Sequence, residues 1–88
     1  MNIIYKYPVD IIGTTILKLP AGSIILKAAN QNEKLNVWAE ITDDTNTTSY
    51  RFYVIPTGGQ IDSYDKTYLD TVLFVDGKFI LHVYYKKE

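Results

Sequence analysis

The chain has 88 residues and a formal net charge of −1, with 47% hydrophobic and 22% charged residues. This length corresponds to one domain, residues 1–88, and the composition is too apolar for a disordered protein. Without an excess of positive charge there is no field to attract polymeric nucleic acid, so an anionic ligand would have to be small. The absence of cysteine excludes disulfides, thiol catalysis and thiolate metal sites.

The N-terminal residues give no sign of a targeting segment. Met1 to Tyr7 lack the basic region and the apolar run of a signal peptide. No apolar stretch reaches the roughly 18 residues of a membrane helix. We therefore expect a cytoplasmic protein with no membrane partner.

The pattern of apolar residues predicts an all-β fold. Apolar positions alternate or run in short blocks, and turn residues recur roughly every 8 to 12 positions. We expect about seven short, mainly antiparallel strands in a small sandwich or a partly open barrel. The expected strands span residues 2–7, 14–19, two strands of a hairpin within 23–41, and 50–55, 67–75 and 78–86.

The hairpin within residues 23–41 is predicted to turn at Asn32-Glu33. The register that places most apolar residues on one face pairs Ile24 with Ile41, Leu26 with Ala39, Ala28 with Val37 and Asn30 with Leu35. Trp38 then points away from this face with Lys27 beside it, close enough for a cation–π contact. Two alternatives remain open for Trp38. It plugs a second layer or the underside of a loop, or it forms an oligomer interface or a platform for ligand stacking.

The wholly polar stretch 42–49 is predicted to be a loop. Its adjacent carboxylates, Asp43 and Asp44, lack the further oxygen ligands and the glycine of a calcium loop. We therefore expect no metal site there.

The strand 50–55 holds the only arginine of the chain. Phe52 and Val54 are expected to face the core, which leaves Arg51 and Tyr53 on the opposite face. Pro56 ends the strand, and Thr57, Gly58 and Gly59 follow. Converging glycine N–H groups can form an anion nest, but the spacing of a Walker loop is missing, so a structural turn is the other interpretation.

The last hairpin is predicted to turn at Asp76-Gly77. The resulting register pairs Phe74 with Phe79, Val72 with Leu81, Asp70 with Val83 and Tyr68 with Tyr85, and on the other face Leu73 with Ile80, Thr71 with His82 and Leu69 with Tyr84. Because both faces are apolar, the hairpin is either sandwiched within the domain or covered by another subunit. We expect the second arrangement, a homo-oligomer.

Conventional catalysis has little support in the sequence. His82 is the only histidine and lies mid-strand among apolar neighbours, and no serine has the context of a nucleophile elbow. We expect no enzyme activity, no catalytic residue, no metal and no cofactor. The remaining donors and aromatic groups suit a small anionic aromatic ligand such as a nucleotide, or an ordinary protein interface. The candidate ligand-binding residues are Lys6, Tyr7, Trp38, Arg51, Tyr53, Thr57, Gly58 and Gly59.

A string of motifs along the chain resembles a known family. The motifs are Ile4-Tyr5-Lys6-Tyr7-Pro8, Leu19-Pro20-Ala21-Gly22-Ser23-Ile24-Ile25-Leu26, Val37-Trp38-Ala39, Arg51-Phe52, Thr57-Gly58-Gly59, Ile61-Asp62 and Phe79-Ile80-Leu81-His82-Val83. In this order they are similar to a family of roughly hundred-residue proteins that is common in bacteriophage genomes and catalogued as a domain of unknown function. The family usually has Thr-Gly-His where this chain has Thr57-Gly58-Gly59, which weakens any role for side chains of that loop.

The resemblance implies a role in phage counter-defence, acting in the host cytoplasm. One class of such proteins, the anti-CBASS sponges, oligomerises and sequesters cyclic nucleotide immune signals without turnover. For this chain the sponge hypothesis implies a pocket between subunits. Arg51 and Lys6 would bind phosphate, Trp38 or Tyr53 would stack on a base, and Thr57, Gly58 and Gly59 would give backbone contacts. The alternatives are a protein-binding module that inhibits a host factor and a minor virion component.

Overall fold

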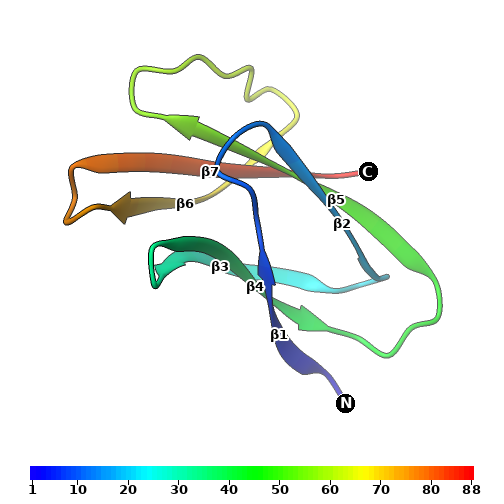
Figure 1. The fold of residues 1–88 in the computed structure, drawn as a ribbon. Coiled ribbons are helices and arrows are strands. Elements are labelled where there is room, and N and C mark those ends of the chain that lie inside the picture. Colours follow the sequence, from blue (N-terminus) through cyan, green and yellow to red (C-terminus); the bar gives the residue numbers. More distant parts are fainter.

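The computed structural model covers residues 1–88 and consists of strands joined by turns, as the sequence predicts. Seven strands follow one another along the chain (Figure 1). They are β1 (Ile3–Pro8), β2 (Thr14–Pro20), β3 (Ile24–Gln31), β4 (Lys34–Ile41), β5 (Thr47–Pro56), β6 (Thr67–Phe74) and β7 (Phe79–Lys87).

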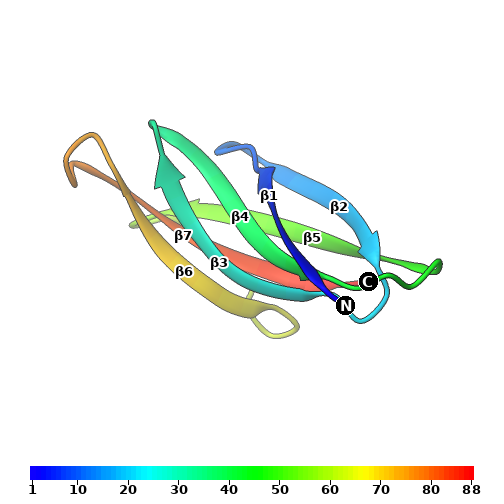
Figure 2. The same cartoon turned by 90° about the horizontal axis from the view of Figure 1, so that it is seen from below.

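The strands form two sheets that pack as a sandwich, and the predicted all-β fold is confirmed. One sheet has three strands in the order β1-β4-β3, and the other has four in the order β2-β5-β7-β6. All neighbouring strands are antiparallel. The sandwich is not a closed barrel, and β1 and β2 diverge from the turn that joins them (Figures 1 and 2).

The core lies between the sheets and follows the two-residue alternation of the strands. The largest fully buried side chains are Phe52, Leu19, Leu81, Val37 and Val83, which come from β2, β4, β5 and β7. Since alternate residues of a strand face opposite sides, the intervening residues form the two outer faces of the sandwich. These outer faces carry the residues that are available for binding.

The β3–β4 hairpin has the predicted turn but a different register at its far end. Asn32 and Glu33 both have positive φ, 56° and 60°, as a two-residue hairpin turn requires. The register shifts between Ile25 and Lys27, so Leu26 forms a β-bulge. Beyond the bulge the predicted pairs of Ile24 with Ile41 and Leu26 with Ala39 are wrong. Ile25 pairs with Ala39 and is buried, whereas Leu26 is exposed.

The β6–β7 hairpin shows the same behaviour. Five predicted cross-strand pairs are confirmed: Phe74 with Phe79, Leu73 with Ile80, Val72 with Leu81, Thr71 with His82 and Asp70 with Val83. A register shift between Tyr68 and Asp70 then makes Leu69 a bulge, so that Tyr68 pairs with Tyr84 and not with Tyr85. The turn is also longer than predicted, because the strands end at Phe74 and resume at Phe79.

The polar stretch 42–49 is only partly a loop. β5 begins at Thr47, and its first residues pair with the end of β2, from Lys18 to Pro20. The prediction of a loop up to Ser49 is therefore wrong. Polar composition did not prevent strand formation here because these residues meet a neighbouring strand that supplies their hydrogen-bond partners.

The edge strands β3 and β6 of the two sheets lie beside each other without a backbone ladder. Side chains bridge them instead. Asp70 Oδ2 accepts a hydrogen bond from the Ala28 N–H at 3.2 Å, and Asn30 Nδ2 donates one to the Leu73 carbonyl at 3.0 Å. A slit of 170 Å³ remains between the strands. This seam closes one side of the sandwich, while the side between β1 and β2 stays open.

Candidate functional site

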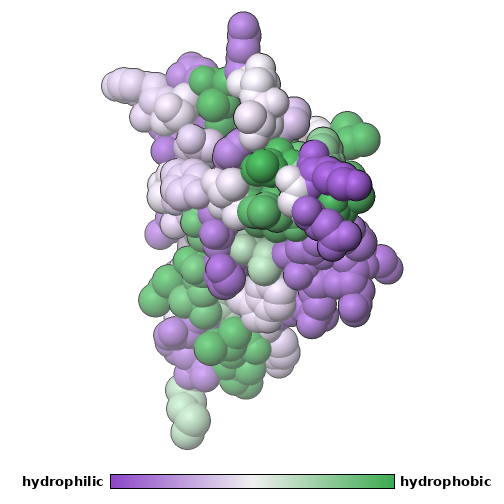
Figure 3. All heavy atoms as spheres, turned by 90° about the vertical axis from the view of Figure 1, so that its left-hand side faces the viewer, coloured by the Kyte–Doolittle hydropathy of each residue, from purple (hydrophilic) through white to green (hydrophobic).

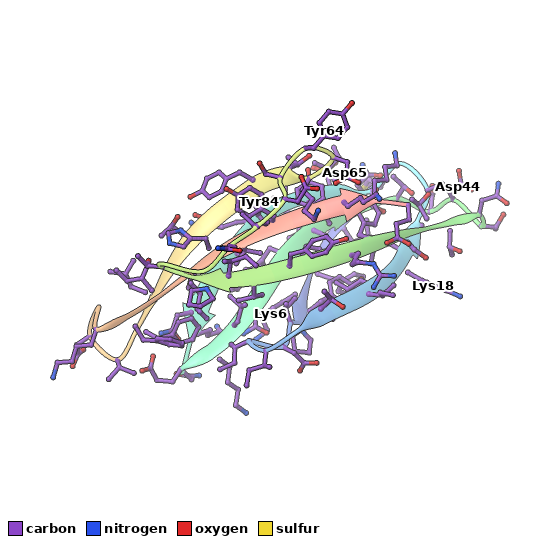
Figure 4. The ribbon with its side chains drawn as sticks, turned by 90° about the horizontal axis from the view of Figure 1, so that it is seen from above. Lys6, Lys18, Asp44, Tyr64, Asp65 and Tyr84 are labelled. Carbon is purple, nitrogen blue, oxygen red and sulfur yellow. The ribbon has the colours of Figure 1, made fainter.

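The structure divides the predicted ligand-binding residues between two opposite faces. Lys6 and Trp38 lie on the outer face of the three-stranded sheet, because their neighbours Val37 and Ala39 fill the core. Arg51 and Tyr53 lie on the outer face of the four-stranded sheet. In Figure 4, Lys6 lies apart from Asp65 and Tyr84, which belong to the second face. One ligand on a single copy of the chain therefore contacts only one of the two groups.

Trp38 lies in the middle of the three-stranded sheet, where β4 has a neighbour on each side. Lys6 of β1 and Lys27 of β3 are its direct cross-strand partners. The indole is partly exposed and borders an open hollow of 430 Å³. The hollow is lined by Ile4, Leu26, Lys27, Ala29 and Trp38. No loop covers Trp38, so the prediction that it plugs the underside of a loop is wrong.

The two lysines beside Trp38 differ in their own partners. Lys27 Nζ lies 3.4 Å from Asp70 Oδ2, and it pairs with this carboxylate in place of the predicted contact with the Trp38 ring. Lys6 Nζ donates a hydrogen bond to Gln31 Oε1 at 2.5 Å. Because an amide carries no charge, the positive charge of Lys6 remains uncompensated. Lys6 is therefore a cation next to Trp38 that is free to bind an anion, and Lys34 of β4, on the same face, also has no ion pair.

The exposed apolar side chains form separate groups on the surface. Figure 3 faces the turn ends of the two hairpins and shows apolar side chains near the β6–β7 turn and a second group lower down, at the height of β1 and β4. Ile4, Ile24 and Leu26 are 59, 52 and 43% exposed and belong to the outer face of the three-stranded sheet. The surroundings of Trp38 are thus apolar and accessible.

On the outer face of the four-stranded sheet, Arg51, Lys66 and Lys86 are paired with carboxylates, whereas Lys18 of β2 has no ion pair. Arg51 Nε lies 2.6 Å from Glu88 Oε1, and this carboxylate raises the pKa of the guanidinium. Lys66 Nζ lies 4.8 Å from the centre of the Tyr53 ring. Arg51 is predicted to bind phosphate, and the Glu88 carboxylate beside it offsets its charge and disfavours an anion there.

A short loop is tied down over the same face. Asp65 bonds Lys86 Nζ at 2.9 Å and Lys66 Nζ at 3.2 Å. These hydrogen bonds, first that of Lys86 and then that of Lys66, lower the pKa of Asp65 to about 2. Figure 4 shows Tyr64 projecting outward next to Asp65. The loop occupies the space above β5 and β7 that a ligand would need.

The Thr57-Gly58-Gly59 segment has the geometry of a structural turn. The Gly59 N–H donates to the Pro56 carbonyl at 2.8 Å, so it does not point outward as in an anion nest. Gly58 has a φ of 91°, and a Cβ at Gly59 would lie 2.8 Å from Ile55 Cγ2. Both glycines are therefore needed for the backbone path itself.

A chain of hydrogen bonds runs from this turn across the sheet. Thr57 Oγ1 lies 2.8 Å from His82 Nε2, Thr71 Oγ1 lies 3.1 Å from His82 Nδ1, and Tyr68 Oη lies 2.6 Å from Thr71 Oγ1. Both ring nitrogens of His82 are thus engaged by threonine hydroxyls.

Tyr7 is separate from both groups. Its side chain faces inward from β1 and packs against the hydrophobic core. A direct contact with a ligand on either outer face is not compatible with this orientation.

Sequence reasoning missed the apolar part of the hollow. Ile4 precedes Lys6 by two residues on the same face of β1, so the alternation was available to identify it. Ala29 pairs with Asn36 as the predicted hairpin register places it, on the face of Trp38, whereas Leu26 depends on the bulge in β3, which turns it outward. No local sequence signal marks that bulge.

The structure has no helix of the length and hydrophobicity that crossing a bilayer requires. No three His, Asp or Glu side chains come together in a way that could hold a metal ion. No curated protein and no solved structure matches the chain. A family model described as a domain of unknown function, DUF7352, matches residues 1–88, and the chain therefore belongs to this family.

Proposed function

We propose that the protein is a binding protein without catalytic activity, which holds a small anionic aromatic ligand against Trp38 on the outer face of the three-stranded sheet. The observation that carries this proposal is the combination of a partly exposed indole, an apolar hollow of 430 Å³ and the uncompensated charge of Lys6. An aromatic ring stacks on a nucleobase, and an ammonium binds phosphate. Both groups approach the ligand from one side.

The ligand class that fits best is a cyclic nucleotide, and the biological role is counter-defence in a phage-infected cell. Sequestration needs affinity and no chemistry, which suits a face with no nucleophile or general base directed at the hollow. The resemblance to phage proteins supports the same role. In this proposal the protein lowers the free concentration of a host immune signal in the host cytoplasm.

The proposed binding site contains fewer of the residues that the sequence suggests, and all of its residues lie on the three-stranded sheet. Trp38 stacks on the base and Lys6 bonds the phosphate, while Ile4 and Leu26 contact the apolar edge of the ligand. Arg51 and Tyr53 lie on the other face, where Arg51 is paired with Glu88 and a loop covers part of the surface, and Thr57, Gly58 and Gly59 form the turn after β5.

Isothermal titration calorimetry with a panel of cyclic di- and trinucleotides tests the proposal. We expect at least one member to bind, and Trp38→Ala to weaken its binding by roughly 1–3 kcal/mol, the range for one lost stacking contact. Lys6→Ala should cost roughly 1.5–3 kcal/mol, as for a hydrogen bond to a charged group.

The opposite face supplies matched controls. Tyr53→Ala and Arg51→Ala remove the same types of group and should leave the affinity unchanged. Absence of binding for every nucleotide by folded protein, or equal losses for both pairs of variants, would contradict the proposal.

A further inference from the structure

The free edge of β1 is the one sheet edge that is left without a partner and without a charged side chain across it. The edges of β3 and β6 are bridged to each other through Asp70 and Asn30. The edge of β2 carries Lys18, which is exposed and has no ion-pair partner, and a free charge on an edge strand discourages pairing. Lys6 of β1 is instead held to Gln31 of β3, so its ammonium is drawn across β4 and away from the edge.

The backbone of β1 shows which groups face outward at this edge. The Val9 N–H donates to the Leu35 carbonyl of β4 at 3.0 Å. In an antiparallel pair, alternate residues direct both backbone groups to the same side. Tyr5, four residues earlier, therefore points toward β4 as well. Ile4 and Lys6 direct their N–H and C=O groups outward, where the sheet ends.

We propose that two copies of the chain pair through the free edges of their β1 strands, antiparallel about a twofold axis at Tyr5. In this register Ile4 lies opposite Lys6 of the second copy, and these are the residues whose backbone groups face outward. Tyr5 lies opposite Tyr5 of the second copy as a pair without mutual backbone hydrogen bonds. The edge is therefore complementary to itself, which is the requirement for a twofold contact.

The side chains around the edge of β1 also favour a second copy of the chain as its partner. Ile3 and Tyr5 face the inner side of the sheet, yet they are 55 and 51% exposed because the four-stranded sheet does not cover them. Half of the exposed large hydrophobic side chains lie in the first sixteen residues: Met1, Ile3, Ile4, Tyr5, Ile11, Ile12 and Ile16, of fourteen in all. In the proposed register Ile3 packs against Tyr7 of the second copy and the two Tyr5 rings meet, so the exposed parts of Ile3 and Tyr5 become covered.

The twofold contact adds backbone hydrogen bonds between the two copies along β1. Five residues of each β1, Ile3 to Tyr7, pair in this register and join the two three-stranded sheets into one sheet of six strands. Removing two open edges at once also lowers the tendency to pair with unrelated strands.

The dimer bears on the ligand site, and this consequence rests on the proposed function. Ile4 lines the hollow, and in the dimer Lys6 of the second copy lies directly opposite Ile4 on the same outer face. Each hollow is then bordered by a lysine from each copy. The pairing of the strands itself does not require a ligand.

A single introduced cysteine tests the register, because the chain has no cysteine of its own. Directly opposed residues without mutual hydrogen bonds have Cα atoms about 4.5 Å apart, within the range that a disulfide spans. Tyr5→Cys should therefore form a covalent dimer readily under mild oxidation. The matched control is Ile3→Cys, on the same face and equally exposed. Residue 3 lies opposite residue 7 of the second copy, so the two introduced cysteines would be four residues apart, about 14 Å along the strand. They should therefore cross-link about tenfold more slowly than Tyr5→Cys or not at all.

Light scattering of the unmodified protein at micromolar concentration provides a second readout. We expect a mass of twice 10.1 kDa. Ile4→Pro removes an N–H that faces the second copy and keeps the bonds to β4, so it should return the protein to a folded monomer, as judged by circular dichroism. A monomer for the unmodified chain, or equal cross-linking of Tyr5→Cys and Ile3→Cys, would overturn the proposal. Nucleotide affinity is measured separately, so loss of the dimer and loss of the ligand site are distinguishable.

Discussion

Val75 is the one β-branched residue of the chain with a positive φ. The other non-glycine residues of this kind are Asn32, Glu33 and Asp76, which are polar turn residues. The φ of Val75 is 51°, a conformation in which a β-branched side chain crowds its own backbone. Its N–H donates to Glu33 Oε1 at 2.8 Å, and this bond, after that from the Asn30 side chain, lowers the pKa of Glu33. The contact between the two hairpin turns holds Val75 in place.

Replacing Val75 by asparagine should stabilise the protein. Asparagine tolerates the left-handed region, where other L-residues are disfavoured by about 1–2 kcal/mol. The Val75 side chain is 55% exposed, so little buried apolar surface is lost. We expect the free energy of unfolding, measured in urea, to rise by about 1 kcal/mol. Leu73→Asn, at a similarly exposed position of β6 with ordinary φ, is the control, and an equal gain there would contradict this explanation.

At the scale of the elements, the strands and the turn-proximal registers were predictable from the sequence, whereas the bulges were not. A register is determined locally where a turn such as Asn32-Glu33 sets it. The bulges at Leu26 and Leu69 arise far from their turns. They lie on the edges of β3 and β6 that face each other, next to the bridging Asp70. They lie at a contact between two sheets, and alternation within one hairpin contains no information about such a contact.

Asp70 should be the most sensitive residue of the seam between β3 and β6. Its carboxylate accepts the Ala28 N–H, a backbone group that no neighbouring strand satisfies. Asp70→Ala leaves this partly buried donor without an acceptor, which we expect to cost about 1–3 kcal/mol of unfolding free energy. Asp70→Asn keeps an acceptor oxygen and loses the ion pair with Lys27, an exposed pair worth about 1 kcal/mol or less.

Urea unfolding of both variants, together with hydrogen exchange at the Ala28 amide, checks this prediction. Only Asp70→Ala should accelerate exchange at Ala28 strongly. Equal destabilisation by the two variants would show that the charge, and not the hydrogen bond, holds the seam.

At the scale of the whole molecule, the sequence identified the residue types of the candidate site but not their arrangement. Trp38 and Lys6 were candidates because of their chemistry, and so were Arg51 and Tyr53. Alternation placed each of these residues on the face of its strand opposite the core. Which strands share a sheet is decided by pairings between distant segments, such as β1 with β4 and β2 with β5. Those pairings put the two groups of candidates on opposite sides of the sandwich.

Because the two sheets share one core, damage to one sheet should unfold the other. Phe52 belongs to the four-stranded sheet and is fully buried, and truncation of a buried phenylalanine to alanine costs about 3–5 kcal/mol. The total stability expected for 88 residues is only roughly 4–13 kcal/mol. Phe52→Ala should therefore remove a large fraction of it. Tyr53→Ala, the adjacent residue on the outer face, should cost about 0.5–1 kcal/mol through its contact with Lys66.

The single tryptophan makes the cooperativity measurable, since Trp38 lies on the sheet that does not contain Phe52. In urea, Trp38 fluorescence reports the three-stranded sheet, while far-ultraviolet circular dichroism reports all strands. For Phe52→Ala we expect both midpoints to shift together to lower urea, because neither sheet can keep its inner face covered once the other is lost. A Trp38 transition that stays at its original midpoint while the dichroism shifts would mean that the sheets unfold independently. The hollow beside Trp38 would then persist without the four-stranded sheet.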